Sequence, residues 1–143
     1  MSNTPSKALR VSILVIHSKQ LLKETHKQTG IEGEATVIEY LKNSGYQIHA
    51  CNYRYHGGEI DIIAQRGDII SFVEVKTRKT QYLEHLSAVI TPTKQRKIIR
   101  TAQHYLLRHQ HTAVVLRFDV ALVEYKNSIT TISYFPNAFS ASE

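Results

Sequence analysis

Three residues in the middle of the chain have side chains that can do chemistry together, namely Asp61, Glu74 and Lys76. Side chains along a strand alternate between its two faces, so Glu74 and Lys76, two residues apart, point to the same side of a strand. An aspartate followed by a Glu-x-Lys pair on a neighbouring strand is the D…ExK arrangement of metal-dependent nucleases. We therefore expect these three residues to form the catalytic centre.

A hairpin turn between the two strands would bring the acids together. If residues 67–68 are its two central residues, counting outward puts Asp61 opposite Glu74 and Glu59 opposite Lys76. Opposed residues have Cβ atoms about 4.5 to 5.5 Å apart, and two like charges at that distance are destabilising. A bound cation would compensate the repulsion, whereas a slip of one residue would move Asp61 to the other face.

The expected cation is Mg²⁺ or Mn²⁺, because hard oxygen ligands surround the site. Mg²⁺ keeps several waters, so two carboxylates, the backbone carbonyl of Val75 and a phosphate oxygen of a substrate suit it. Lys76 could then stabilise charge that develops on phosphorus or orient the attacking water. The alternative interpretation is structural: Lys76 pairs with Glu59, and Asp61 faces solvent on a half-exposed sheet.

A first helix is predicted to place a third acid. Residues 29–32 read Thr-Gly-Ile-Glu, which matches a capping box, and the helix should run to about Asn43 before Gly45 ends it. Glu34 falls on the apolar stripe of that helix, where a carboxylate needs a partner. With capping already assigned to Glu32, we expect Glu34 to belong to the metal site, directly or through water.

The remaining elements follow from alternation, turn residues and helical spacing. Strands are predicted over 46–53, 59–65, 69–77, 113–124 and 129–135, and a second helix over 93–109 with Ile98, Ala102 and Tyr105 buried. The order αβββαββ implies an α/β fold, with a mixed sheet flanked by helices. We place one domain at 29–143 and leave residues 1–28 as an unassigned amino-terminal extension.

The charge of the chain favours an anionic partner. The sequence has 18 lysines and arginines against 12 aspartates and glutamates, a net charge of +6. In the second helix basic residues recur every fourth position, as expected of a face that contacts phosphates along a duplex. A solvated helix face is the plainer alternative. The candidate nucleic-acid contacts are Arg78, Lys94, Arg96, Lys97 and Arg100.

Other classes of protein are disfavoured. Cys51 is the only cysteine, which excludes an internal disulfide and a cysteine zinc site. The apolar run at 11–16 is far shorter than the roughly 20 residues of a membrane span and is followed by no cleavage site. Metalloprotease, serine-hydrolase and Walker motifs are missing. We expect a cytoplasmic protein that does not contact a membrane.

At this level of detail the sequence resembles the bacterial YraN family. The similarity extends from Gly30 to Phe139, and its most specific blocks are Gly-Glu-Ile-Asp at 58–61 and Phe-Val-Glu-Val-Lys-Thr-Arg at 72–78. The other matching segments are 30–34, 40–41, 45–46, 52–54, 62–64, 88–89, Lys94, 117–120 and 137–139. The Tyr82-Leu83 pair departs from the aromatic-glycine pair that the family often has there.

The resemblance implies a restriction-endonuclease-like fold, similar to that of archaeal Holliday-junction resolvases. It implies Glu34, Asp61 and Glu74 as metal-site acids and Lys76 as the catalytic lysine. We expect a metal-dependent phosphodiesterase that acts on structured or branched DNA. By analogy with resolvases, a homodimer is a candidate assembly. A nucleic-acid-binding or adaptor protein with a vestigial site is the main alternative, and a protein-interaction module is a third.

Overall fold

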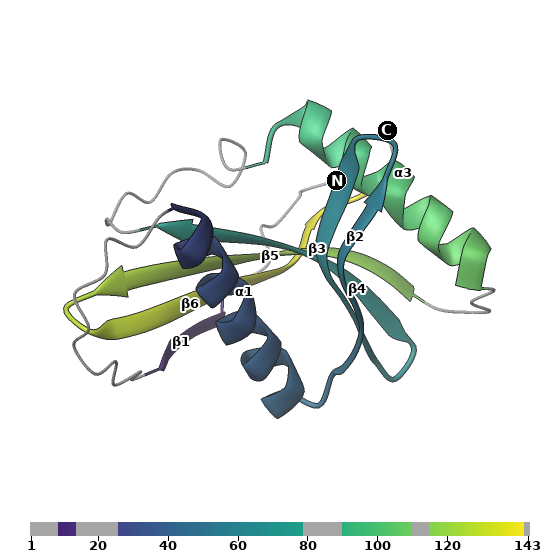
Figure 1. The fold of residues 1–143 in the computed structure, drawn as a ribbon. Helices are drawn as coiled ribbons and strands as arrows, with labels where there is room; N and C mark the ends of the chain where they lie inside the picture. Colours follow the sequence, from purple (N-terminus) through teal and green to yellow (C-terminus); the bar gives the residue numbers. More distant parts are fainter. Residues whose placement is uncertain (1–8, 14–25, 79–89, 110–114, 142–143) are drawn as a thin grey trace, which may run out of the picture.

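The computed structural model describes residues 9–13, 26–78, 90–109 and 115–141, which form a mixed six-stranded sheet between two helices (Figure 1). The strands lie in the order β1-β6-β5-β4-β3-β2, and β4 and β5 pair in parallel. The elements are β1 (Leu9–Ile13), α1 (His26–Asn43), β2 (Gln47–Tyr55), β3 (Gly58–Arg66), β4 (Ile69–Arg78), α3 (Pro92–His109), β5 (Val115–Lys126) and β6 (Ile129–Phe139).

This architecture confirms the predicted α/β class and is consistent with a restriction-endonuclease-like fold. The strand β1 is an addition to the predicted order, since it lies within the unassigned extension and pairs antiparallel with β6 at one edge of the sheet. The division of the chain at residue 28 stays a prediction. The Tyr82-Leu83 departure and the predicted start of a strand at Ala113 lie outside the described residues.

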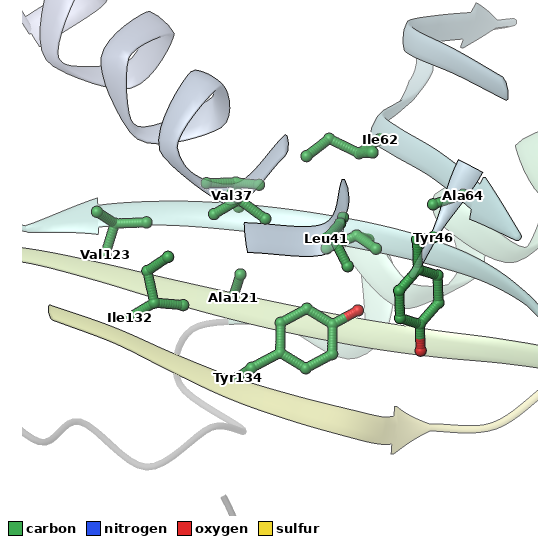
Figure 2. Packing of buried hydrophobic residues seen from close by; sticks show 11 residues of the cluster. Val37, Leu41, Tyr46, Ile62, Ala64, Ala121, Val123, Ile132 and Tyr134 are labelled. Atoms are coloured by element: carbon green, nitrogen blue, oxygen red, sulfur yellow. The ribbon is translucent and has the colours of Figure 1, made fainter. Parts of the chain in front are cut away.

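The two helices cover opposite faces of the sheet, each over its own apolar cluster. Val37 and Leu41 of α1 belong to one cluster with Val73 and Val75 of β4. Figure 2 shows the same two α1 residues with Ala121 and Val123 of β5 and Ile132 and Tyr134 of β6. On the other face, α3 packs on the side chains that alternate with these. The second cluster includes Ile70, Phe72, Ile98, Ala102 and Tyr105, the last three being the stripe predicted for this helix.

The start of α1 differs from the prediction, whereas its end agrees. The helix begins at His26, so the 29–32 segment lies inside it and the predicted capping box is wrong. Thr29 is buried, which fits a helical position facing the protein. At the other end Gly45 adopts a φ of +87°, and the Gly45 and Tyr46 amides donate to the carbonyls of Lys42 and Leu41, a Schellman termination.

The hairpin between β3 and β4 has the predicted register as far as it is paired. Arg66 lies opposite Ile69, and the pairing continues to Ile62 opposite Val73. No further pairs follow between these two strands in the described region, so the strands part before Asp61. The predicted pairings of Asp61 with Glu74 and of Glu59 with Lys76 are therefore not formed, because β3 and β4 diverge (Figure 1).

The β2–β3 hairpin turns away from β4 and toward α3. Its two-residue turn, His56 and Gly57, has φ values of 41° and 76°. After the turn, Gly58 lies so close to the Thr101 hydroxyl and the Lys97 carbonyl that a Cβ would overlap them. The hairpin therefore docks against the helix through a position that only glycine can fill.

A buried polar network holds the carboxyl-terminal part of the sheet. Asp119, with no exposed surface, accepts hydrogen bonds from the Arg117 guanidinium at 2.9 Å, from the Tyr134 hydroxyl at 2.6 Å and from the Asn137 amide at 2.9 Å. Arg117 also donates to the Tyr46 hydroxyl at 2.6 Å. These contacts explain the charged pair in the otherwise apolar first part of β5, residues 115–123.

Neither of the described helices combines the length and apolar character needed to cross a membrane.

Candidate active site

The point at which β3 and β4 diverge brings together side chains from five elements. Glu34 comes from α1, Asn52 from β2, Asp61 from β3, Glu74 and Lys76 from β4, and Lys94 from α3. Each of the predicted acids and the predicted lysine interacts with at least one other member of this group. The structure therefore joins segments that are separated by up to sixty residues in the chain.

Glu74 is the most buried of these acids, with 4% of its side chain exposed. It forms a short ion pair with Lys94 and a longer one with Lys76, whose Nζ lies 3.7 Å from its Oε1. Its strand neighbours explain its position: Phe72 belongs to the α3 side of the sheet, and alternation places Glu74 and Lys76 on that side. The alternative pairing of Lys76 with Glu59 is not formed.

Asp61 closes the gap between the diverging strands with its side chain. Its Oδ2 accepts a hydrogen bond of 2.7 Å from the Val75 amide, which has lost its backbone partner on β3. Burial and the negative charge of Glu74 raise the pKa of Asp61 to about 7, against the lowering effect of the Val75 amide. A half-buried carboxyl that resists ionisation next to another acid is a place where a cation would be stabilised.

Glu34 of α1 is the third acid at the point where β3 and β4 diverge. Its Oε2 accepts a hydrogen bond of 3.3 Å from the Asn52 amide. Burial raises the pKa of Glu34, and the charges of Glu59 and Glu74 raise it further. The preceding Gly33 brings α1 close to the end of β4, where a Cβ would overlap the Thr77 hydroxyl.

The pKa values of the two lysines at the site, Lys76 and Lys94, are shifted in opposite directions. Burial and the positive charge of Lys94 lower the pKa of Lys76. For Lys94, burial also acts to lower the pKa, but the hydrogen bond and charge of Glu74 outweigh it and leave the pKa raised. Lys76 is thus the lysine with less compensation, and Lys94 is the one held by the acid.

The start of α3 determines where Lys94 lies. The Thr91 hydroxyl accepts a hydrogen bond of 3.2 Å from the Lys94 amide, as an N-cap does, and Pro92 occupies the first helical position. Lys94 therefore sits in the first turn, at the positive end of the helix dipole. The sequence predicts Lys94 only as a nucleic-acid contact, and the structure places it within the acidic group.

The other predicted nucleic-acid contacts spread along the surface next to the site. Arg78 ends β4 and is half-exposed, while Arg96, Lys97 and Arg100 are exposed on α3. Arg96 donates to the Thr93 hydroxyl at 3.1 Å, and Arg100 donates to the His56 carbonyl at 3.2 Å. These residues border the site on one side, and their contact with nucleic acid stays a prediction.

Asn52 is a site residue that we did not select from the sequence. It stands at φ 51°, a left-handed conformation that asparagine tolerates better than most residues, in the middle of β2. The signal available was an asparagine, a poor strand former, inside a strand-like segment. Its conformation turns its amide toward Glu34.

A family model matches the part of the chain that contains these residues. The model of the uncharacterised protein family UPF0102 matches residues 33–123, which include every acid and lysine of the site. The chain belongs to the UPF0102 family. This is the YraN family that the sequence resembles, so that resemblance is confirmed.

Individual UPF0102 relatives match over nearly their whole length. The chain is 41% identical to the UPF0102 protein of Caldicellulosiruptor saccharolyticus over 115 residues, 79% of this chain and 98% of the relative. It is 43% identical to that of Alkaliphilus oremlandii over 116 residues, 80% of this chain and 99% of the relative. With the relative from Geobacter metallireducens the identity is 37% over 114 residues, 80% of this chain and 93% of the relative.

Proposed function

We propose that this protein is a metal-dependent endonuclease that hydrolyses the phosphodiester backbone of structured or branched DNA. The observation that carries the proposal is the convergence of Glu34, Asp61 and Glu74 with Lys76 at the diverging ends of β3 and β4. Lys94 joins them from α3. Acids that repel one another beside two cationic side chains are costly for a structure and useful for phosphate chemistry.

The acids fit a divalent cation with hard oxygen ligands. Among the described residues no three His, Cys, Asp or Glu side chains are close enough together to ligate one ion directly. Mg²⁺ commonly takes one or two carboxylates and keeps several waters, so Asp61 and Glu74 are sufficient as direct ligands. Glu34 would act through water, and the Val75 carbonyl, next to the amide that Asp61 binds, is the expected backbone ligand.

The ion, Mg²⁺ or Mn²⁺, would supply charge neutralisation at the scissile phosphate and a lower pKa for the attacking water. Lys76, whose own pKa is lowered by burial, would bind a phosphate oxygen or hold the water in line. Lys94 forms an ion pair with Glu74. A divalent cation bound to Glu74 would compete with this ion pair, and the Lys94 ammonium group would then be free to contact a phosphate.

The choice of DNA as the substrate depends on charge and fold. The net charge of +6 and the exposed cations Arg96, Lys97 and Arg100 beside the site suit a polyanion. The restriction-endonuclease-like fold is similar to that of archaeal Holliday-junction resolvases, which suggests branched substrates and action as a homodimer.

The test is cleavage of end-labelled duplex, nicked, gapped and four-way-junction DNA in Mg²⁺ or Mn²⁺, with EDTA as the blank. Glu74→Gln and Lys76→Met keep the side-chain sizes, and we expect each to reduce cleavage by at least about 100-fold. The matched controls are Glu39→Gln and Lys42→Met, an exposed pair on α1 at 3.9 Å, and these should cleave normally.

Cleavage that survives both site variants would refute the proposed centre. DNA binding that weakens steeply with salt, with no cleavage in either metal, would instead identify a binding or adaptor protein with a vestigial site. Mass measurement of the DNA complex would show whether two copies assemble on one junction.

A further inference from the structure

The tip of the β2–β3 hairpin carries aromatic and basic side chains that the proposed catalytic centre does not use. We name Arg54, Tyr55, His56 and the His104 ring of α3 the hairpin platform. The Tyr55 and His104 rings are stacked, with centroids 3.8 Å apart and an angle of 11° between their planes. His56 meets Tyr55 nearly at right angles, with centroids 4.4 Å apart.

Contacts with Tyr53 of β2 and with α3 hold the platform in place. The His104 Nδ1 lies 2.9 Å from the Tyr53 hydroxyl, and this hydrogen bond fixes the ring on which Tyr55 stacks. Arg100 donates to the His56 carbonyl, and Gly58 allows the strand to touch α3. Rings held in this way need little ordering when a flat ligand stacks on them.

The turn residue itself is unusual for its conformation. Both central residues of the turn have positive φ, as in a type I′ turn, where asparagine, aspartate or glycine is preferred at the first position. His56 occupies that position at a φ of 41° and is exposed. The imidazole therefore stands at an exposed turn tip, where a ligand can reach it.

A hollow beside the platform gives it the shape of a binding site. It has a volume of about 280 Å³ and is lined by Arg54 to Glu59. Arg54 lies across it in an ion pair of 3.3 Å with Glu59, and 75% of its side chain is exposed. The hollow therefore combines flat rings, a guanidinium and one carboxylate, a set that can hold a heterocycle with amino and carbonyl groups.

The platform lies at a short, defined distance from the proposed catalytic centre. Gly58 and Asp61 are three residues apart on β3, or about 10 Å at the usual strand rise. A base on the platform and a phosphate at the catalytic centre could therefore belong to the same DNA strand. On α3, the exposed cations Lys97 and Arg100 follow the same direction from Lys94.

We propose that the hairpin platform binds an unpaired nucleobase of DNA next to the catalytic centre, with the base stacked on the exposed His56 ring and the Tyr55 ring, which His104 supports, against its edge. This inference rests on the proposed function for its partner and specifies the substrate: DNA with unpaired nucleotides, as in gaps, flaps and junctions. A paired base cannot stack there, since its faces are covered in the duplex. Stacking on aromatic side chains is the general way in which proteins hold unpaired bases.

The experiment measures base stacking without requiring cleavage. A duplex with a three-nucleotide gap carries 2-aminopurine in the gap, and an intact duplex carries it in a base pair; both are titrated with the full chain in EDTA. We expect quenching of the gap fluorophore and tighter binding of the gapped DNA. Tyr55→Leu and His56→Asn, the second of which retains the turn, should abolish the quenching and weaken gap binding about 5- to 100-fold.

Matched variants separate stacking from charge and from folding. Tyr55→Phe should bind as the parent does, since the ring is kept. Arg54→Ala should weaken gap binding, whereas Arg10→Ala, an exposed strand arginine at the opposite edge of the sheet, should not. Thermal melting of each variant confirms that the hairpin is folded.

The outcomes distinguish this inference from the proposed function. Quenching that depends on Tyr55 and His56, with no cleavage in any metal, would support the platform and refute the nuclease. Cleavage together with equal affinity for gapped and intact DNA would refute the platform and leave the nuclease. Loss of both affinities to the same extent in Tyr55→Leu, or no binding of either DNA, would also overturn the platform.

Discussion

Replacing Asp61 with asparagine is expected to stabilise the metal-free protein above neutral pH. The pKa of Asp61 rises from an ordinary value of 3.8 to about 7, mainly because of burial and the charge of Glu74. At about 1.4 kcal/mol per pH unit, a rise of about 3 units corresponds to about 4 kcal/mol. Access of water to this half-buried group reduces the figure, so we expect about 2 to 3 kcal/mol.

The direction follows from the order of the two pKa values. Because the folded pKa is the higher one, the folded state resists ionisation, and the protein loses stability as the pH rises from about 4 to about 7. Above about pH 7 the penalty is constant. Asparagine carries no proton to lose, and its amide oxygen can still accept the Val75 hydrogen bond, so the variant should lack this pH dependence.

Urea unfolding of the parent, Asp61→Asn and Asp68→Asn between pH 4.5 and 8.5, in EDTA, measures the effect. Asp68 lies in the exposed turn between β3 and β4 and is the matched control. Saturating Mg²⁺ should then stabilise the parent, more at pH 8 than at pH 6, and leave Asp61→Asn almost unchanged. A variant that is less stable than the parent at pH 8, or a parent whose stability relative to Asp61→Asn is flat across this range, would refute the reasoning.

Three further predictions concern the contacts that hold the site. Lys94→Met should destabilise the metal-free protein by about 1 to 3 kcal/mol in urea unfolding, because a buried carboxylate loses its partner, and added Mg²⁺ should recover part of the loss; no change would contradict the ion pair. Gly33→Ala should lower the melting temperature, equivalent to about 1 to 3 kcal/mol, because the added Cβ overlaps the Thr77 hydroxyl, and Thr77→Ala should restore it in the double variant. Effects of the two substitutions that simply add would contradict this overlap. Asp119→Asn should cost about 3 kcal/mol or more by chemical denaturation, since the Arg117 charge is left buried, while Mg²⁺ affinity of the folded protein stays within about twofold; a large change in that affinity would link the network to the site.

Much of the fold was predictable because its signals are local. The β3–β4 register from Arg66 opposite Ile69 to Ile62 opposite Val73 followed from the turn at Gly67 and Asp68, since a two-residue turn defines the pairs next to it. The end of α1 followed from Gly45, and the buried stripe of α3 from its spacing. The start of α1 was mispredicted because residues 29–32 match the sequence pattern of a capping box, although the helix begins about one turn earlier, at His26.

The grouping of Glu34 with the strand acids was predicted from its place on an apolar stripe and from the family resemblance. The reason offered from capping does not hold, but the structure brings Glu34 close enough for the charge of Glu74 to raise the pKa of Glu34 and for the charge of Glu34 to raise that of Asp61. Asn52 and the inward position of Lys94 could not be read from spacing. They depend on how β2 and α3 pack next to the point where β3 and β4 diverge, and the residues of the D…ExK pattern do not predict this packing.

By itself the sequence determined the identity of the chemical groups and the β3–β4 register from Arg66 opposite Ile69 to Ile62 opposite Val73, because side-chain alternation and a two-residue turn act over a few residues. Only the tertiary structure decided that β3 and β4 part at this point, that the Asp61 carboxylate binds the freed Val75 amide, and that Lys94 neutralises Glu74. Those contacts form between elements far apart in the chain, where helix packing and the docking of Gly58 on α3 set the geometry. The separation of the strands lets the Asp61 side chain take the Val75 amide that a backbone carbonyl would otherwise bind.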